Sequence, residues 1–289
     1  MEELLGVKLY VRGNEISLDT DDANKYTLFK SMIEQLEDFI KMGQEPETDL
    51  IMAIHKALNS GDKDEPQLFK KQHISIPGAG KKIYPKSKNQ AKYLDAIDTH
   101  EIIFSAGPAG TGKTFLAVAK ALQAVFSRTH KRLVITRPVV EAGESLGYLP
   151  GDLAQKINPY LRPIYDSMWH LITQEGVKKL EDSGQLEIAP LAYMRGRTLA
   201  ESIIILDEAQ NTTREQMKML LTRLGAGSKL IVTGDITQID LPRKKESGML
   251  HAIELMKHIH EICIMFFTEQ DVVRHPLVRK IINAYESEE

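Results

Sequence analysis

The sequence predicts an α/β protein: a mainly parallel β-sheet flanked by helices, preceded by a small α+β domain. Three observations support this fold class. Apolar runs of strand length alternate with helical patterns from residue 101 onward, which is typical of parallel sheets. A glycine-rich turn joins one of these runs to a helical pattern. Residues 6–58 instead combine an alternating segment with helical patterns.

A β-hairpin is predicted over residues 6–18, because apolar residues alternate on both sides of the Gly13-Asn14 pair, which suits a tight turn. An amphipathic helix should follow, since apolar residues recur at steps of three and four: Tyr26, Phe29, Ile33, Leu36 and Ile40. We expect this apolar stripe to cover the hairpin. A short helix is predicted around residues 50–58.

Residues 1–75 are therefore expected to form the small α+β domain and its linker, with RNA or a partner protein as candidate ligands. The linker reading rests on the glycines and prolines of residues 59–88. Residues 76–289 are expected to form the larger domain. Its excursion at 138–199 contains many prolines, which predicts an insertion packed against the sheet, with some helix around 164–182. The expected strands are 101–106, 132–136, 202–206, 229–233 and 262–267, and the expected helices lie near 113–127, 213–224, 247–258 and 276–286.

The glycine-rich turn reads Gly-Pro-Ala-Gly-Thr-Gly-Lys-Thr and fits the phosphate-binding pattern G-x-x-x-x-G-K-[ST] in full. We call it the P-loop. Its glycines allow backbone N–H groups to surround a phosphate at a helix N-terminus. Lys113 can reach the terminal phosphates of a nucleotide, and the Thr114 hydroxyl can hold Mg²⁺. The predicted nucleotide-binding residues are Gly107, Pro108, Ala109, Gly110, Thr111, Gly112, Lys113 and Thr114.

Two carboxylates, Asp207 and Glu208, follow the apolar run 203–206. Beside a P-loop, the first acid at such a strand end holds Mg²⁺, usually through water, and the second can polarise the attacking water. We assign these roles to Asp207 and Glu208. The alternative is an acidic N-cap of a helix that follows a buried strand.

A further strand ends in Gly-Asp-x-x-Gln at residues 234–238. Because strand ends converge on the ligand crevice in such sheets, Gln238 is a candidate for placing the attacking water. Asp235 is expected to fix the loop or a neighbouring arginine. A purely structural turn is the alternative.

The composition is that of a globular protein, with 42% hydrophobic and 27% charged residues. Neither a membrane-spanning run nor a signal peptide is recognisable in the sequence, so a soluble, cytoplasmic protein is expected. The single cysteine, Cys263, excludes an intrachain disulfide. Residues 70–92 contain 7 lysines and no acid. This basic segment permits contact with nucleic acid, although a solvated lysine-rich linker fits equally well.

The order of the motifs resembles the first motor domain of superfamily 1 helicases, so the fold expected for residues 76–289 is a P-loop NTPase fold of the RecA/helicase-like type. In those enzymes an upstream glutamine reads adenine, which would assign Gln90 to ATP recognition. The sequence resembles the PhoH family of P-loop ATPases more closely. The blocks that carry this resemblance are Arg137-Pro138, 141–144, 149–152, 159–163, 195–198, 207–211, 221–223 and 271–276. The resemblance implies a ring-forming homo-oligomer, a hexamer, with the cleft at a subunit interface.

An arginine that stabilises the transition-state charge must complete such a site. Only 51 residues follow Gln238, too few for a second motor domain. The arginine is then expected from this domain or from a neighbouring subunit. The candidates are Arg274, Arg223, Arg195 and Arg197, with Arg274 first and Arg223 also counted among the nucleotide-contacting residues.

The predicted function is Mg²⁺-dependent binding and hydrolysis of ATP. Two uses of that chemistry stay open at this point. One is an RNA-associated motor or remodeller that acts on single-stranded RNA with an RNA-processing partner. The alternative is a nucleotide-gated assembly factor or switch that acts through a partner protein.

Overall fold

The computed structural model describes residues 1–41, 43, 46, 48–59, 72–79, 82–138, 153–243, 246–273, 277–278 and 281. The chain forms two compact units. Unit 1 comprises Met1–His73 and Lys82–Ala91, and unit 2 comprises Ile74–Lys81 and Lys92–Glu289. The chain therefore passes between the units more than once. The single boundary expected near residue 75 stays a prediction.

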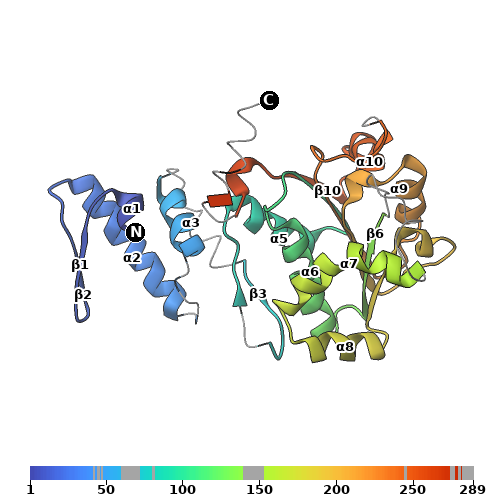
Figure 1. The fold of residues 1–289 in the computed structure, drawn as a ribbon, viewed down its shortest axis with the longest axis horizontal. Helices are drawn as coiled ribbons and strands as arrows, with labels where there is room; N and C mark the ends of the chain where they lie inside the picture. The colour runs from blue at the N-terminus through green and yellow to red at the C-terminus, as the bar shows by residue number, and fades with distance from the viewer. Residues whose placement is uncertain are drawn as a thin grey trace. The chain divides into compact units, whose positions relative to one another are not determined.

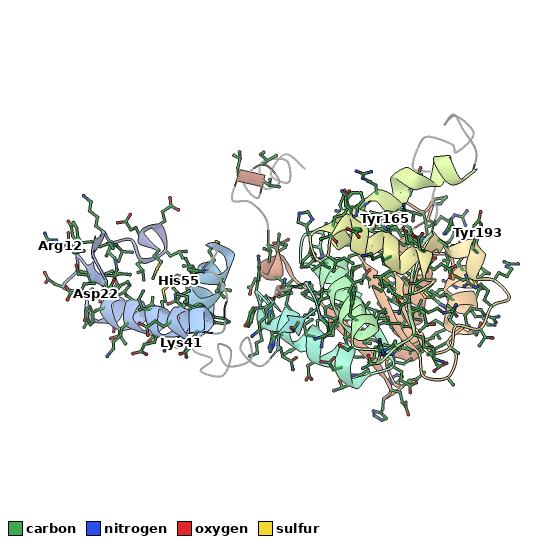
Figure 2. All side chains as sticks on the ribbon, turned by 90° about the horizontal axis from the view of Figure 1, so that it is seen from below. Arg12, Asp22, Lys41, His55, Tyr165 and Tyr193 are labelled. Carbon is green, nitrogen blue, oxygen red and sulfur yellow. The ribbon has the colours of Figure 1, made fainter. Side chains whose placement is uncertain are left out.

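Unit 1 contains the predicted hairpin and the two predicted helices, together with a short helix at its start. Strands β1 (Leu9–Arg12) and β2 (Glu15–Leu18) pair antiparallel, with Val11 opposite Ile16. Helix α1 (Glu2–Leu5) precedes them, and α2 (Ala23–Lys41) and α3 (Thr48–Asn59) follow. Figure 2 marks Arg12 on the hairpin, Lys41 at the end of α2 and His55 on α3. A short strand, β4 (Lys82–Ile83), and the first residues of α5 (Lys88–Thr99) complete the unit.

The expected packing of α2 on the hairpin is found in part, because Val7, Leu9 and Leu18 pack against the core to which α2 contributes. The side chains that α2 buries are Phe29, Met32, Leu36 and Phe39, and they share a core with α3. Tyr26 and Ile40, which belong to the predicted apolar stripe, are more than half exposed. Val11 on the hairpin is 67% exposed. Phe29 and Leu36 of the predicted stripe are buried in this core, and Met32 and Phe39 widen the buried face of α2.

Unit 2 is built on a sheet of six parallel strands in the order β10-β5-β9-β8-β6-β7. The inner strands are buried on both faces, as in β8, where every residue is buried. This arrangement confirms the predicted α/β fold with a parallel sheet. The strands are β5 (Ile102–Ala106), β6 (Arg132–Arg137), β7 (Leu186–Pro190), β8 (Ser202–Leu206), β9 (Lys229–Gly234) and β10 (Ile262–Phe266). A separate short strand, β3, spans Ile74–Ser75.

Helices cover both faces of this sheet (Figure 1). On one face α6 (Lys113–Phe126) contacts β6, β8 and β9, and α7 (Leu153–Trp169) packs against α6. On the other face α9 (Arg214–Leu221) and α10 (Gly248–Met256) enclose a core with the inner strands. Short 3-10 helices span Leu191–Met194 (η2), Ala209–Asn211 (η3) and Glu269–Asp271 (η5). None of the helices in the described ranges is long and apolar enough to cross a membrane.

The excursion at 138–199 is more than an insertion packed against the sheet. Residues 139–152 lie outside the described residues. The rest forms α7, then α8 (Gln174–Asp182), and then β7, which pairs with β6 as an edge strand of the sheet. The sequence hides this strand because it is short, ends in Pro190 and is only partly buried, as edge strands usually are. The helix expected near 276–286 falls mostly outside the described residues.

Because all six strands are parallel, their carboxyl ends lie along one edge of the sheet and their amino ends along the other. We call these the carboxyl edge and the amino edge. The P-loop follows β5, so it lies at the carboxyl edge, as do the residues that follow β6, β8 and β9.

Candidate active site

The P-loop joins β5 to α6 and is pinned to the neighbouring strand. The Gly107 N–H donates to the Gly234 carbonyl at the end of β9, at 3.1 Å. A Cβ atom at Gly107 would lie 2.6 Å from the Phe267 carbonyl oxygen, so this position needs glycine. Gly112 has a φ of 81° and turns the chain into the first residue of α6. The loop is therefore shaped by contacts with β9 and with the residue after β10.

Lys113 lies across the loop. Its Nζ donates to the carbonyl oxygens of Gly107 at 2.7 Å and Pro108 at 2.8 Å, and the residue is 7% exposed. The amine thus stands at the N-terminus of α6, where backbone N–H groups and the helix dipole favour an anion. This is the position from which a lysine can transfer its hydrogen bonds to phosphate oxygens.

Asp235 fixes the loop from the next strand end, as predicted. Its Oδ2 accepts the Ala109 N–H at 2.9 Å, and its Oδ1 accepts both the N–H and the hydroxyl of Thr237. A buried carboxylate with three such donors is well compensated for its loss of hydration. Asp235 therefore stabilises the loop.

Asp207 is the centre of the polar cluster, and its side chain is 3% exposed. Its Oδ1 accepts the hydroxyls of Thr114 and Thr233, each at 2.7 Å. Because Thr114 gives its proton to Asp207, the lone pairs of the Thr114 oxygen are available to a cation. Oxygen ligands of this kind suit Mg²⁺, which also keeps several of its waters. The residues present therefore fit the metal that the sequence predicts.

Arg137, the last residue of β6, also binds Asp207. Its Nε and Nη2 donate to Asp207 Oδ2 at 2.8 and 2.5 Å, and its Nη1 donates to the Tyr160 carbonyl on α7 at 2.7 Å. This arginine has no role predicted from the sequence, although Arg137-Pro138 is one of the blocks that carry the family resemblance. Its place at the end of an apolar strand, next to the strand that carries Asp207, was the available signal.

Glu208 adopts a left-handed backbone conformation, with φ 54° and ψ 37°, and its side chain is 46% exposed. Gln210 donates from Nε2 to Glu208 Oε2 at 2.7 Å and to the Gln238 carbonyl at 3.1 Å. The side chain of Gln238 is itself exposed. Gln210 thus links Glu208 to Gln238. It was not itself predicted as a site residue. An accessible carboxylate held in this way can accept a hydrogen bond from water.

The structure brings Lys113, Thr114, Asp207 and Glu208 to the carboxyl edge, and the chain at Gln238 joins them through Gln210. Gln90 belongs to unit 1, where its Oε1 accepts the Lys86 N–H. Its role in reading adenine stays a prediction. Arg274 lies outside the described residues.

Two of the other candidate arginines, Arg223 and Arg197, lie near the amino edge. Arg223 N–H groups donate to the Arg197 carbonyl and to Thr222, and Arg197 forms a two-bond pair with Glu187 at the start of β7. Arg195 is exposed nearby in sequence. A strand of five residues spans about 15 Å, so the structure does not bring Arg223 or Arg197 to the P-loop of the same chain.

The chain is similar to known proteins over most of its length. The model of the family described as "PhoH-like protein" matches residues 82–286. A PhoH-like protein of Mycobacterium tuberculosis is 46% identical over 99% of this chain and 80% of its own length. One from Bacillus subtilis is 46% identical over 100% of this chain and 90% of its own length. Protein PhoH of Escherichia coli is 45% identical over 70% of this chain and 58% of its own length.

Similarity to solved structures is more distant. The large terminase of a thermophilic bacteriophage in complex with ADP is 12% identical, with a TM-score of 0.39 over 68% of this chain and 48% of that chain. We draw no conclusion from a similarity of this size. The match to the family model, together with relatives that are similar over almost the whole chain, shows that the chain belongs to the PhoH-like protein family.

Proposed function

We propose that this protein binds ATP together with Mg²⁺ and hydrolyses it. The observation that carries the proposal is the convergence of Lys113, Thr114, Asp207 and Glu208 at one edge of a parallel sheet. Nucleotide binding is also supported by membership of the family. Hydrolysis is the further step, and it rests on the geometry of the acidic pair.

Each residue has a distinct task in this proposal. Lys113 and the N–H groups of the P-loop hold the phosphates, and Thr114 and Asp207 hold the metal. Bound Mg²⁺ supplies positive charge that offsets charge developing on the phosphate oxygens. Glu208 orients the attacking water, since its carboxylate is accessible and fixed by Gln210. Gln238 is the second candidate for that water.

The Glu208 assignment can be tested with Glu208→Gln. The variant should bind ATP with nearly unchanged affinity, because the carboxylate does not touch the P-loop lysine. It should hydrolyse ATP about 10²–10⁴ times more slowly. Glu201→Gln, at an exposed carboxylate at the amino edge, is the matched control. Hydrolysis by Glu208→Gln at the wild-type rate would remove Glu208 from the mechanism.

We further propose that hydrolysis is coupled to single-stranded RNA, in concert with an RNA-processing protein. The seven lysines of residues 70–92 support contact with a polyanion. The test is the ATPase rate with and without single-stranded RNA at several salt concentrations, with Lys113→Ala as the blank. Absence of both RNA stimulation and salt-dependent RNA binding would favour the alternative, a nucleotide-gated switch that acts through a protein partner.

We also propose that the arginine for the transition state comes from a neighbouring subunit of a ring, a hexamer. The position of Arg223 and Arg197 at the amino edge supports a role in trans for either of them, and Arg274 remains the first candidate by sequence. Light scattering should establish the assembly state first. Lys113→Ala subunits mixed with Arg274→Ala subunits should then regain part of the ATPase rate, and the same mixture made with Arg223→Ala tests the second candidate. A fully active monomer would contradict the ring.

A further inference from the structure

We propose that Arg137 couples the acidic pair at the carboxyl edge to helix α7, so that binding of Mg²⁺ and nucleotide shifts α7 and reshapes a hollow at its far end. The inference rests on the proposed nucleotide binding. It assigns to Arg137 the role of a positioning residue, which acts through Asp207, Glu208 and the Tyr160 carbonyl.

The first step concerns the lone pairs of Asp207. A carboxylate offers about two acceptor sites on each oxygen. Oδ1 accepts the hydroxyls of Thr114 and Thr233, and Oδ2 accepts two N–H groups of Arg137. Both oxygens are therefore saturated. A metal-bound water can hydrogen-bond to Asp207 only if one of these donors withdraws.

Arg137 is the donor that can withdraw. The Thr114 bond is the one that leaves the hydroxyl oxygen free for the metal, and Thr233 is fixed within β9 and is fully buried. Arg137 has a long side chain and a second carboxylate within reach, since its Nη2 lies 3.6 Å from Glu208 Oε1. Repulsion between the guanidinium and an incoming dication acts in the same direction. The expected exchange moves the guanidinium from Asp207 toward Glu208.

The second step links this exchange to α7. Arg137 Nη1 donates to the Tyr160 carbonyl, which lies near the middle of α7. A guanidinium is planar and rigid, so Nη1 cannot stay in place while Nε and Nη2 change partners. Either the hydrogen bond from Arg137 to the Tyr160 carbonyl then breaks, or α7 moves with the guanidinium. The Tyr165 hydroxyl binds Glu181 on α8 at 2.7 Å, so a shift of α7 would extend to α8.

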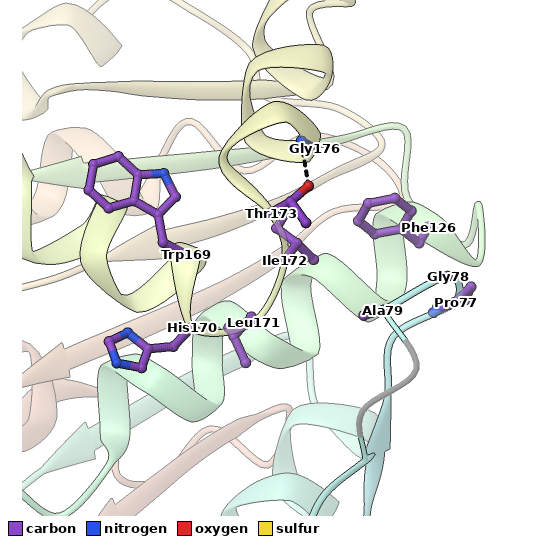
Figure 3. A pocket seen from close by; sticks show the side chains of 10 residues that line it. All are labelled: Pro77, Gly78, Ala79, Phe126, Trp169, His170, Leu171, Ile172, Thr173 and Gly176. Carbon is purple, nitrogen blue, oxygen red and sulfur yellow. Dashed lines mark hydrogen bonds between the residues drawn. The ribbon is translucent and has the colours of Figure 1, made fainter.

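The end of α7 borders an open hollow of about 400 Å³ (Figure 3). Trp169 at the end of α7 and Ile172 after it line this hollow, together with Phe126 at the end of α6 and Pro77. Helix α6 begins at the P-loop and α7 is tied to Arg137, so both helices that border the hollow are anchored at the carboxyl edge. A change in the position of α7 relative to α6 would change the shape of the hollow.

Trp169 provides the measurement, because it is the only tryptophan of the chain. It lies beneath the Arg162 guanidinium, 4.7 Å from the ring centroid, and next to Tyr165. Emission of Trp169 should change when Mg²⁺ and a non-hydrolysable ATP analogue are added together. It should not change with the analogue in a chelator, because without the metal Arg137 stays on Asp207. Binding of the analogue is measured separately by calorimetry, and hydrogen exchange of the α7 amides gives a second readout.

Arg137→Ala and Arg137→Lys are the test variants. Each should bind the analogue and lose most of the emission change and of the difference in α7 exchange. Lysine keeps the charge but cannot hold Asp207 and the Tyr160 carbonyl at once. Arg132→Lys is the control, since Arg132 begins the same strand and binds Ser202 at the amino edge. This control should keep the full signal.

The outcomes separate the two proposals. If the wild-type protein does not bind the analogue, the proposed function fails, and the coupling fails with it. If it binds the analogue while Trp169 and the α7 amides show no change, the coupling alone is overturned. A full signal in both Arg137 variants would also overturn it. Loss of binding in both variants would place Arg137 in direct contact with the nucleotide and end the proposed coupling.

Discussion

Both edges of the parallel sheet carry many polar side chains. Those at the carboxyl edge converge on one site, whereas those at the amino edge join neighbouring elements. At the carboxyl edge, groups from β6, β8 and β9 converge on the P-loop, and several of them bond to one carboxylate, Asp207. At the amino edge, polar side chains such as Lys229 and Ser228 join one element to its neighbour. Lys229 Nζ donates to the carbonyls of Ile97 and His100 at the end of α5, and Ser228 donates to the Leu199 carbonyl.

The difference shows how to separate a candidate site from structural polar bonds in a parallel sheet. At the amino edge the described bonds are satisfied locally and involve partners on adjacent elements. At the carboxyl edge, Glu208 is accessible, and Lys113 holds acceptors of its own loop, bonds that it can exchange for those to a ligand. The following predictions test that comparison, from the largest expected effect to the smallest.

Lys113→Ala should remove most of the proposed ATPase activity while leaving the fold intact. The change removes the cation that would contact the terminal phosphates, so ATP turnover should fall by about 10²–10³. Calorimetric titration and an ATPase assay measure the effect. Lys131→Ala, which removes an exposed ion pair with Glu201, is the control and should change neither.

Asp207→Ala should destabilise the protein by about 3 kcal/mol, because it leaves the guanidinium of Arg137 largely buried without its carboxylate. Denaturant unfolding gives the free energy. Removing both partners, in Asp207→Ala/Arg137→Ala, should cost less than the sum of the two single changes. Additive costs would show that the pair is not energetically coupled.

Lys229→Met should destabilise by about 1 to 2 kcal/mol without affecting nucleotide binding. It removes charge-assisted hydrogen bonds that cap α5 at the amino edge. Partial burial lowers the pKa of Lys229 and offsets part of the gain from these bonds. The checks are denaturant unfolding and calorimetric titration. A loss of nucleotide affinity would mean that the two edges are not independent.

Glu187→Gln should have the smallest effect, less than about 1 kcal/mol at neutral pH, because the pair with Arg197 is partly exposed. Hydrogen bonds from Arg197 lower the pKa of Glu187 below its ordinary value of 4.5. A carboxyl group whose pKa is lowered in the folded state contributes stability that is fully present above pH 4.5. This stability is lost as the pH falls through the pKa of the folded state. Unfolding measured from pH 6 down to about pH 3 should show a shallower loss for Glu187→Gln than for wild type.

Sequence patterns predicted those parts of the molecule whose structure depends on residues close together in the chain. The P-loop, Asp207 and Glu208 follow from short motifs beside apolar strands, and all strands of the main sheet except β7 were expected. Arg137 received no role because its partner, Asp207, is 70 residues away along the chain. The whole buried face of α2 was not predicted either, since periodicity does not say which neighbour a helix packs against, and Met32 and Phe39 are buried beside the predicted Phe29 and Leu36.

The left-handed backbone of Glu208 has a consequence for the balance between stability and activity. A residue with a Cβ atom is strained at φ 54°, and glycine is not. Glu208→Gly should therefore relieve strain worth about 1 kcal/mol. A more stable protein would then lack the carboxylate proposed to orient water. The strain at this position is thus a local cost of keeping any side chain there, and the unfolding free energy of Glu208→Gly would measure it.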